Sequence, residues 1–286
     1  MTKQALLNPT NDYVFGRIFG YKGNEKITKG FLESITNEKY KTVEISSQVP
    51  TLRDLQDDKI GVLDIKAMAD DATIFDIEMQ VAKNENIAER ILWYWSKLFG
   101  SSITSGKNYL KTKRTIGILI ADFEIEKLYE IKKYHTSWHI REDEYSEIIL
   151  TDKLELHIIE LIKLEVNNNQ NGKTKKLVRW LKFIMNPEEE GFEMSEDEDI
   201  KEAMKVLEQI SQDEREREKA WLREKYIIDA GFYRQDGYEE GFAKGKEKGK
   251  KNEKIKIAKS LLKQKISKEI IVEVTGLTEK ELEELK

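Results

Sequence analysis

The chain has 286 residues, and the 39% that are hydrophobic can bury a substantial core in one large domain or two smaller ones. It contains no cysteine, which excludes disulfides, iron-sulfur clusters and thiolate zinc sites, and its net charge of -5 conceals a charged fraction of 36%. The N-terminus lacks the apolar region of a signal peptide, and no run of about 18 apolar residues occurs. We therefore expect a globular, cytoplasmic protein without a membrane partner.

The first third of the chain predicts helices followed by a hairpin. Apolar residues in 12–35 have helical spacing that is interrupted at GYKGN, which indicates two helices joined by a turn. Residues 40–49 favour an extended strand, and two further strands, roughly 60–68 and 74–82, flank the turn-forming DDAT. Residues 84–104 place their apolar side chains on one stripe, which predicts a long amphipathic helix.

The second third predicts the centre and edge of a sheet. RTIGILIADF (114–123) is almost entirely apolar, as is typical of a central strand covered on both faces. Residues 134–142 and 153–164 have the composition of two more strands, and helical patterns follow from about residue 173. This order predicts an α/β fold, a mixed sheet flanked by helices, over a first domain of residues 1–205.

The remainder of the chain divides into a connector and a small helical module. Residues 206–252 are highly charged, and glycines recur every four residues from Gly237 to Gly249. We expect a charged helical connector with a glycine repeat. Because each glycine disfavours an isolated helix by about 1 kcal/mol relative to alanine, we expect this connector to be flexible or stabilised by a partner. Residues 253–286 predict three short helices, with Ser267 as an N-cap and a capping box from Thr278 to Glu281.

The last of these helices is acidic. EVTGLTEKEL resembles the turn of a helix-turn-helix, whose final helix would enter the major groove of DNA. That helix carries four glutamates, Glu279, Glu281, Glu283 and Glu284, against Lys280 and Lys286. Acids there repel phosphates, so we favour an oligomerisation or partner-docking module, with a homodimer as the expected assembly, over a reader of DNA sequence.

Two basic clusters, residues 106–114 and 172–182, have the charge needed to follow a phosphate backbone. Ordinary solvated surface explains either cluster equally well.

The stretch LDIKAMADDATIFDIEMQV carries charged residues on the polar side of two alternating strands. Because side chains alternate faces along a strand, a loop of odd length at residues 70–72 places Asp64 opposite Glu78 and Lys66 opposite Asp76. Directly opposed residues have Cβ atoms about 4.5 to 5.5 Å apart. The sequence thus predicts two carboxylates in contact range on one face of a hairpin.

Two facing carboxylates repel each other unless a positive charge lies between them. A divalent cation such as Mg²⁺ resolves the conflict, and a bound Mg²⁺ can support cleavage of a phosphodiester. The alternative is a plain cross-strand ion pair between Lys66 and Asp76, with Asp64 and Glu78 simply solvated.

Asp64 on the first strand, then Glu78-Met79-Gln80 on the second and a helix after it, resembles the PD-(D/E)XK nuclease core with an E-x-Q variant of its last motif. Together with NPTNDYVFGRIFG, ERILWYWSKLF, IGILIADF and LELHIIEL, this order resembles the Rpn family of recombination-promoting nucleases, also described as PD-(D/E)XK nuclease family transposases. The resemblance implies a restriction-endonuclease-like core over roughly residues 7–205, with a helical C-terminal extension.

The resemblance also assigns roles to the polar residues of the hairpin. It implies that Asp64 and Glu78 hold Mg²⁺, or Mn²⁺ or Ca²⁺, with the backbone carbonyl of Met79 as a candidate third ligand. Gln80 stands where the wider superfamily has lysine, and it can hydrogen-bond a water or a phosphate oxygen but cannot supply positive charge. Lys66 projects from the same face and is our candidate for the missing cation.

Three further residues are candidates with strong alternatives. Asp12 occupies the place of the family's acid in NDYVF and is a candidate accessory ligand, although TND before an apolar helix is equally an N-cap signal. Arg90 and Tyr94, spaced i, i+4, would contact a phosphate or orient Gln80; otherwise Arg90 pairs with a surface acid and Tyr94 packs in the core.

His135 and His139 have the i, i+4 spacing that converges on zinc in a helix, but their neighbours favour a strand, so we discount a histidine metal site.

The leading hypothesis is a metal-dependent DNA endonuclease, and the resemblance to the Rpn family implies a role in recombination, mobile elements or phage defence. The alternative is a catalytically inactive relative that serves as a DNA-binding or protein-interaction module. Divalent-ion binding separates the two, because an inactive module needs no ion.

Overall fold

A computed structural model of the chain describes residues 5–46, 64–83, 86–102, 112–164, 175–188 and 196–285. The chain forms two compact units, Met1–Ile227 and Ile228–Lys286, and the helix α7 (Glu214–Lys263) contributes residues to both. Parts of the predicted strands at 60–63 and 47–49, and of the basic clusters at 106–111 and 172–174, lie outside the described residues. Within the described chain, no helix is both long and apolar enough to span a lipid bilayer.

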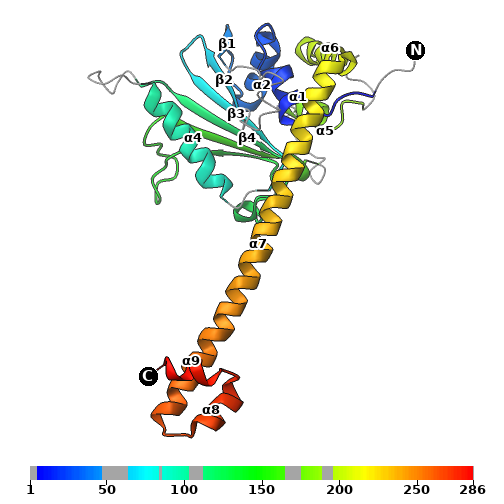
Figure 1. The fold of residues 1–286 in the computed structure, drawn as a ribbon. Coiled ribbons are helices and arrows are strands. Elements are labelled where there is room, and N and C mark those ends of the chain that lie inside the picture. The colour runs from blue at the N-terminus through cyan, green and yellow to red at the C-terminus, as the bar shows by residue number, and fades with distance from the viewer. Residues whose placement is uncertain are drawn as a thin grey trace. The chain divides into compact units, whose positions relative to one another are not determined.

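The first unit contains a mixed sheet, as the sequence predicts (Figure 1). Its strand order is β1-β2-β3-β4-β6-β5. The strands are β1 (Val43–Ile45), β2 (Asp64–Ala69), β3 (Ile74–Gln80), β4 (Thr115–Ala121), β5 (His135–Trp138) and β6 (Leu154–Glu160). β3, β4 and β6 run parallel, and the remaining neighbours pair antiparallel. Every residue of β4 is buried, which confirms the prediction of a central strand covered on both faces.

Helices cover both faces of this sheet (Figure 1). One face packs against α1 (Asp12–Phe19), α2 (Glu25–Thr36), α5 (Lys175–Met185) and α6 (Glu198–Gln212), and the other against α4 (Ile87–Ser101). Because side chains alternate along β3, Phe75, Ile77 and Met79 join the first layer, while the polar residues between them face the side of α4.

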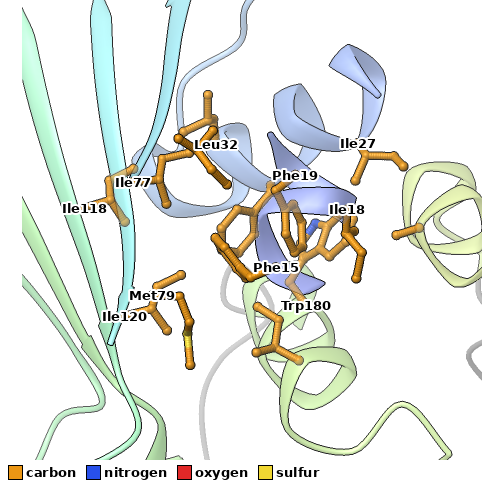
Figure 2. Packing of buried hydrophobic residues seen from close by; sticks show 14 of the residues in the cluster. Phe15, Ile18, Phe19, Ile27, Leu32, Ile77, Met79, Ile118, Ile120 and Trp180 are labelled. Carbon is orange, nitrogen blue, oxygen red and sulfur yellow. The ribbon is translucent and has the colours of Figure 1, made fainter. Parts of the chain in front are cut away.

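Aromatic rings fill the larger core (Figure 2). Phe19 lies with its ring centroid 4.6 Å from that of Phe15, 4.7 Å from that of Phe31 and 5.4 Å from that of Trp180. All four side chains are inaccessible to solvent. Each such pair contributes about 0.5 to 1.5 kcal/mol beyond the burial of its area, so this cluster fixes α1 and α2 on the sheet beside the hairpin.

The register of the hairpin is the predicted one. In the strand register, Asp64 lies opposite Glu78, and Lys66 lies opposite Asp76. The strands are joined through residues 70–72, where Ala72 adopts a left-handed conformation with φ of 68°. A three-residue loop ending in such a residue is a common hairpin geometry. The parity of the loop therefore places both carboxylates on one face.

The second unit is a small helical bundle. The end of α7 packs against α8 (Lys268–Thr275) and α9 (Glu279–Glu283) through a small core of Ala258, Ile271, Leu277 and Leu282. Gly276 ends α8 with φ of 62°, a conformation that glycine adopts without strain. The predicted capping box is present: Thr278 accepts the backbone N–H of Glu281, whose side chain accepts that of Thr278.

The glycine-rich connector is helical in the structure, although glycine at this density disfavours an isolated helix. α7 continues without a break through all the glycines from Gly237 to Gly249. Lysine and glutamate between them are strong helix formers, and they offset part of the glycine penalty.

Candidate active site

Three carboxylates share one face of the hairpin formed by β2 and β3. Asp64 lies opposite Glu78, and Asp76 precedes Glu78 by two residues on the same face of β3. Glu78 is only 6% exposed, and the Oδ1 atom of Asp76 is buried with no hydrogen-bond partner among the described residues. The Nζ of Lys66 lies 3.7 Å from Oδ2 of Asp64 at the more exposed side of this group.

Burial, reinforced by the neighbouring acids, raises the pKa values of two of these carboxyl groups. Burial raises the pKa of Asp76 to about 6, and the charge of Asp64 adds to this effect. Burial also raises the pKa of Glu78 to about 7; Arg90 opposes the rise, and the charges of Asp64, Asp76 and Asp12 reinforce it. A low-dielectric face with several acids therefore favours the approach of a cation.

Arg90 is the cation nearest to Glu78 in the structure. It lies in the first turn of α4, and its Nη2 donates to a carboxylate oxygen of Glu78 and, over 3.2 Å, to Oε1 of Gln80. The other end of Gln80 is fixed as well, because its Nε2 donates to the carbonyl of Ala82 over 2.9 Å. The guanidinium carbon lies 5.6 Å from the ring centroid of Tyr94, within cation–π range. Arg90 thus pairs with an acid of the site and with Gln80.

Asp12 is held by a residue that the sequence did not single out. The N-cap of α1 is Asn11, whose side chain accepts the N–H groups of Tyr13 and Val14, so Asp12 is the first helical residue. Its carboxylate is buried and paired with Arg223 of α7. Arg223 carries no local signal, because it is one charged residue among many in that helix.

The donor set fits a divalent cation with a strong preference for oxygen. Within the described residues, no group of three or more His, Asp or Glu side chains is arranged to hold a metal ion. Mg²⁺ does not need such a cage, since it is commonly held by one or two carboxylates, with waters and substrate phosphates completing its shell. The facing carboxylates of Asp64 and Glu78 and the unpartnered oxygen of Asp76 match that chemistry.

The histidines form a separate network away from the hairpin. As predicted, His135 lies in a strand, β5. Its Nε2 lies 2.8 Å from Nδ1 of His157, and Nε2 of His157 lies 2.8 Å from Oε1 of Glu155. His139 comes only within 3.8 Å of the other oxygen of Glu155, which also pairs with Arg114. His135, His157 and Glu155 are thus joined by hydrogen bonds, as is typical of a structural network.

Comparison with known proteins agrees with the fold. Residues 9–237 match the family model of the PD-(D/E)XK nuclease family transposase, and residues 251–286 match that of the C-terminal HTH domain of the Rpn/YhgA-like nuclease family. Together the two matches confirm the resemblance and the predicted fold class. Neither a search of curated proteins nor a search of solved structures gives a significant match.

Proposed function

We propose that this chain, which belongs to the PD-(D/E)XK nuclease family transposases, is a divalent-metal-dependent DNA endonuclease. Family membership supports a nuclease-like function, and the two matched domain types support DNA as the partner. The proposal of a metal-dependent endonuclease rests on one observation: Asp64 lies opposite Glu78 on the face of the hairpin that Arg90 contacts.

Asp64 and Glu78 are the side chains that would hold the ion, with the backbone carbonyl of Met79 as a third ligand. Mg²⁺ is the preferred ion for this oxygen donor set, and Mn²⁺ and Ca²⁺ are the alternatives to test. When bound, the ion would polarise the phosphoryl oxygen and lower the pKa of a bound water. The buried position of Glu78 excludes solvent from one side of the pair, which strengthens its electrostatic interactions.

Arg90 supplies the positive charge that Gln80 lacks. The superfamily lysine is replaced by Gln80, whose amide oxygen accepts from Arg90 and whose amide nitrogen is anchored on Ala82. Gln80 therefore positions a guanidinium, and the guanidinium can make charge-assisted hydrogen bonds to a phosphate. Tyr94 lies beside this guanidinium and would also contact the phosphate. Lys66 on β2 provides a second positive charge.

Asp12 is an accessory acid in this proposal. Its charge raises the pKa of Glu78, but its carboxylate is already paired with Arg223, so it would shape the field at the site. The biological setting that we propose is DNA recombination, mobile elements or phage defence, in the cytoplasm. Double-strand cleavage would require two sites, which favours a homodimer.

The test is nicking and linearisation of supercoiled plasmid with Mg²⁺, Mn²⁺, Ca²⁺ or EDTA. We expect ion-dependent cleavage that is lost in Asp64→Asn and Glu78→Gln and reduced about 100-fold or more in Arg90→Gln, in line with the loss of a transition-state donor. Glu89→Gln is the matched control, because Glu89 neighbours Arg90 on α4 but pairs with Lys127 at the surface. It should retain wild-type cleavage.

Thermal unfolding with and without Mg²⁺ provides a readout besides activity. A bound ion stabilises the folded state, so wild type should show a rise in melting temperature that Asp64→Asn lacks. Cleavage that survives in EDTA would exclude metal dependence. Absence of both cleavage and an ion-induced shift would favour the inactive DNA-binding or protein-interaction module.

A further inference from the structure

The positive charge of the C-terminal unit lies on one element. Residues 244–263 of α7 contain nine lysines and two glutamates, whereas residues 264–286, which include α8 and α9, contain four lysines and six glutamates. The matched domain is of the helix-turn-helix type, in which the last helix would ordinarily meet DNA. In this chain the charge favours a different element.

α9 is poorly suited to the major groove. It has five residues, Glu279–Glu283, and the groove-entering end of a recognition helix is its N-terminus, where Glu279 and Glu281 lie here. Two of its acids are paired within the unit: Glu281 with Lys251 at 3.1 Å and Glu283 with Lys268 at 3.1 Å. These ion pairs hold α9 on the bundle and leave a net negative helix where phosphates would approach.

The segment 244–254 of α7 has the opposite character. Every residue in it is exposed, and it consists only of lysine, glycine, glutamate and asparagine. Within the described residues, Lys246, Lys248 and Lys250 form no ion pair. At 100° per residue Lys246 and Lys250 share one face of the helix, and Lys248 points away from that face, so positive charge lies on two sides of the helix.

The size of this segment also suits a groove. The major groove of B-DNA is about 12 Å wide and admits an α-helix, and phosphates line both of its rims. Gly245 and Gly249 carry no side chain, and the space around each is open. Each of the two glycines weakens a solvent-exposed helix by about 1 kcal/mol, and contacts with a bound partner would offset this penalty. Because the glycines have no side chain, the partner can approach the helix backbone closely at these positions.

We propose that residues 244–254 of α7 form a basic DNA-contacting helix that lies along the major groove of duplex DNA and binds its phosphates without sequence preference. The inference rests on the proposed function only in taking DNA as the polyanion. The segment has no aromatic or aliphatic side chain, so insertion into a lipid surface, which requires an apolar face, is not favoured.

The experiment is fluorescence anisotropy of a labelled duplex with the full chain in EDTA, which prevents ion-dependent cleavage, over a series of NaCl concentrations. The test variant is Lys246→Gln/Lys248→Gln/Lys250→Gln, and the matched control is Lys265→Gln/Lys268→Gln/Lys280→Gln in and around α8 and α9. We expect the test variant to reduce the slope of log K against log salt by about 2.7, since each phosphate contact contributes about 0.9. The control should keep the wild-type slope.

Two results would overturn the inference. A slope that falls in the control but not in the test variant would assign DNA binding to α8 and α9. Equal slopes in wild type and both variants would assign DNA binding to the first unit, or would point to an acidic protein as the partner of this segment. Glutamine is a good helix former, so unchanged circular dichroism should accompany the loss of binding. Plasmid nicking in Mg²⁺ is scored separately: weak binding by the test variant with no cleavage by wild type would contradict the proposed function and leave this inference standing.

Discussion

Arg223 on α7 holds the carboxylate of Asp12 on α1 through hydrogen bonds from two of its nitrogens: Nε donates to Oδ1 at 2.8 Å and to Oδ2 at 3.0 Å, and Nη2 donates to Oδ2 at 2.5 Å. The residues lie 211 positions apart in the chain, and each side chain is less than 10% exposed. The pair fastens α7 to the helix whose acid contributes to the field at Glu78.

Arg223→Ala should therefore destabilise the first unit severely. Removing one partner of a buried pair leaves the other charge uncompensated, which costs about 3 to 5 kcal/mol. Denaturant unfolding measures this loss. Arg215→Ala, an exposed position on the same helix, should change stability by less than about 0.5 kcal/mol. The double variant with Asp12→Ala should lose much less than the sum of the two single changes; simple additivity would show that the pair is not coupled.

Gly30→Ala should destabilise the packing of α2 against α6. A Cβ atom at position 30 would lie 1.6 Å from Oδ2 and 3.0 Å from Cβ of Asp199, so the clash involves more than a mobile side-chain end. Overpacking of this kind costs about 1 to 3 kcal/mol. The matched control is Gly16→Ala in α1, where a Cβ meets open space and should stabilise the helix by up to about 1 kcal/mol. Equal melting temperatures for the two variants would contradict the prediction.

The histidine network should make the protein sensitive to acid. Burial lowers the pKa of His135 from 6.5 to about 4, with the neighbouring His157 adding to the shift. Because the folded-state pKa is depressed, the folded protein binds fewer protons than the unfolded one. The stabilising contribution is complete above pH 6.5 and is lost as the pH falls through about 4.

Glu155 extends this loss to lower pH. Burial alone would raise its pKa, but hydrogen bonds from His157 and Arg114 lower it from 4.5 to about 2. Its contribution is therefore present above pH 4.5 and is lost as the pH falls through about 2. Urea unfolding of wild type and His135→Gln at pH 7 and pH 4.5 checks the first window: the variant should lose less stability between the two. An equal loss in both proteins would remove His135 as the cause.

Asp76→Asn should raise the stability of the ion-free protein. The carboxylate of Asp76 has one buried oxygen without a partner among the described residues, and it repels Asp64. Replacing a repelling charge by an amide that can donate to a neighbouring carboxylate should yield about 1 kcal/mol, or about 2 to 4 °C in melting temperature. The measurement is thermal unfolding in EDTA, with the exposed Asp152→Asn as the control. A lower melting temperature for Asp76→Asn would show that the charge is structurally required.

The local parts of the site could be predicted from the sequence. The period of two along a strand and the odd length of the loop at residues 70–72 suffice to place Asp64 opposite Glu78, and the structure has that register. The burial of β4, the strand at His135 and the capping box at Thr278 follow from equally short patterns.

The partners of the charged residues could not be predicted in this way. An arginine of α4 could pair with any nearby acid, and only the packing of α4 on the sheet directs Arg90 to Glu78 and Gln80. The glycine connector shows the same limit for backbone structure, since propensity alone does not decide between a flexible segment and a stabilised helix, and the structure has a helix.

The sequence by itself determined the family, the order of the elements and the face of the hairpin that carries the acids, because these depend on patterns a few residues long. Tertiary structure alone decided that Arg223 pairs with Asp12, that Asp199 packs against Gly30 and that His157 hydrogen-bonds to His135. The physical reason is that such contacts depend on how whole helices and strands pack. The residues next to a charged side chain in the sequence do not indicate which distant residue it will contact.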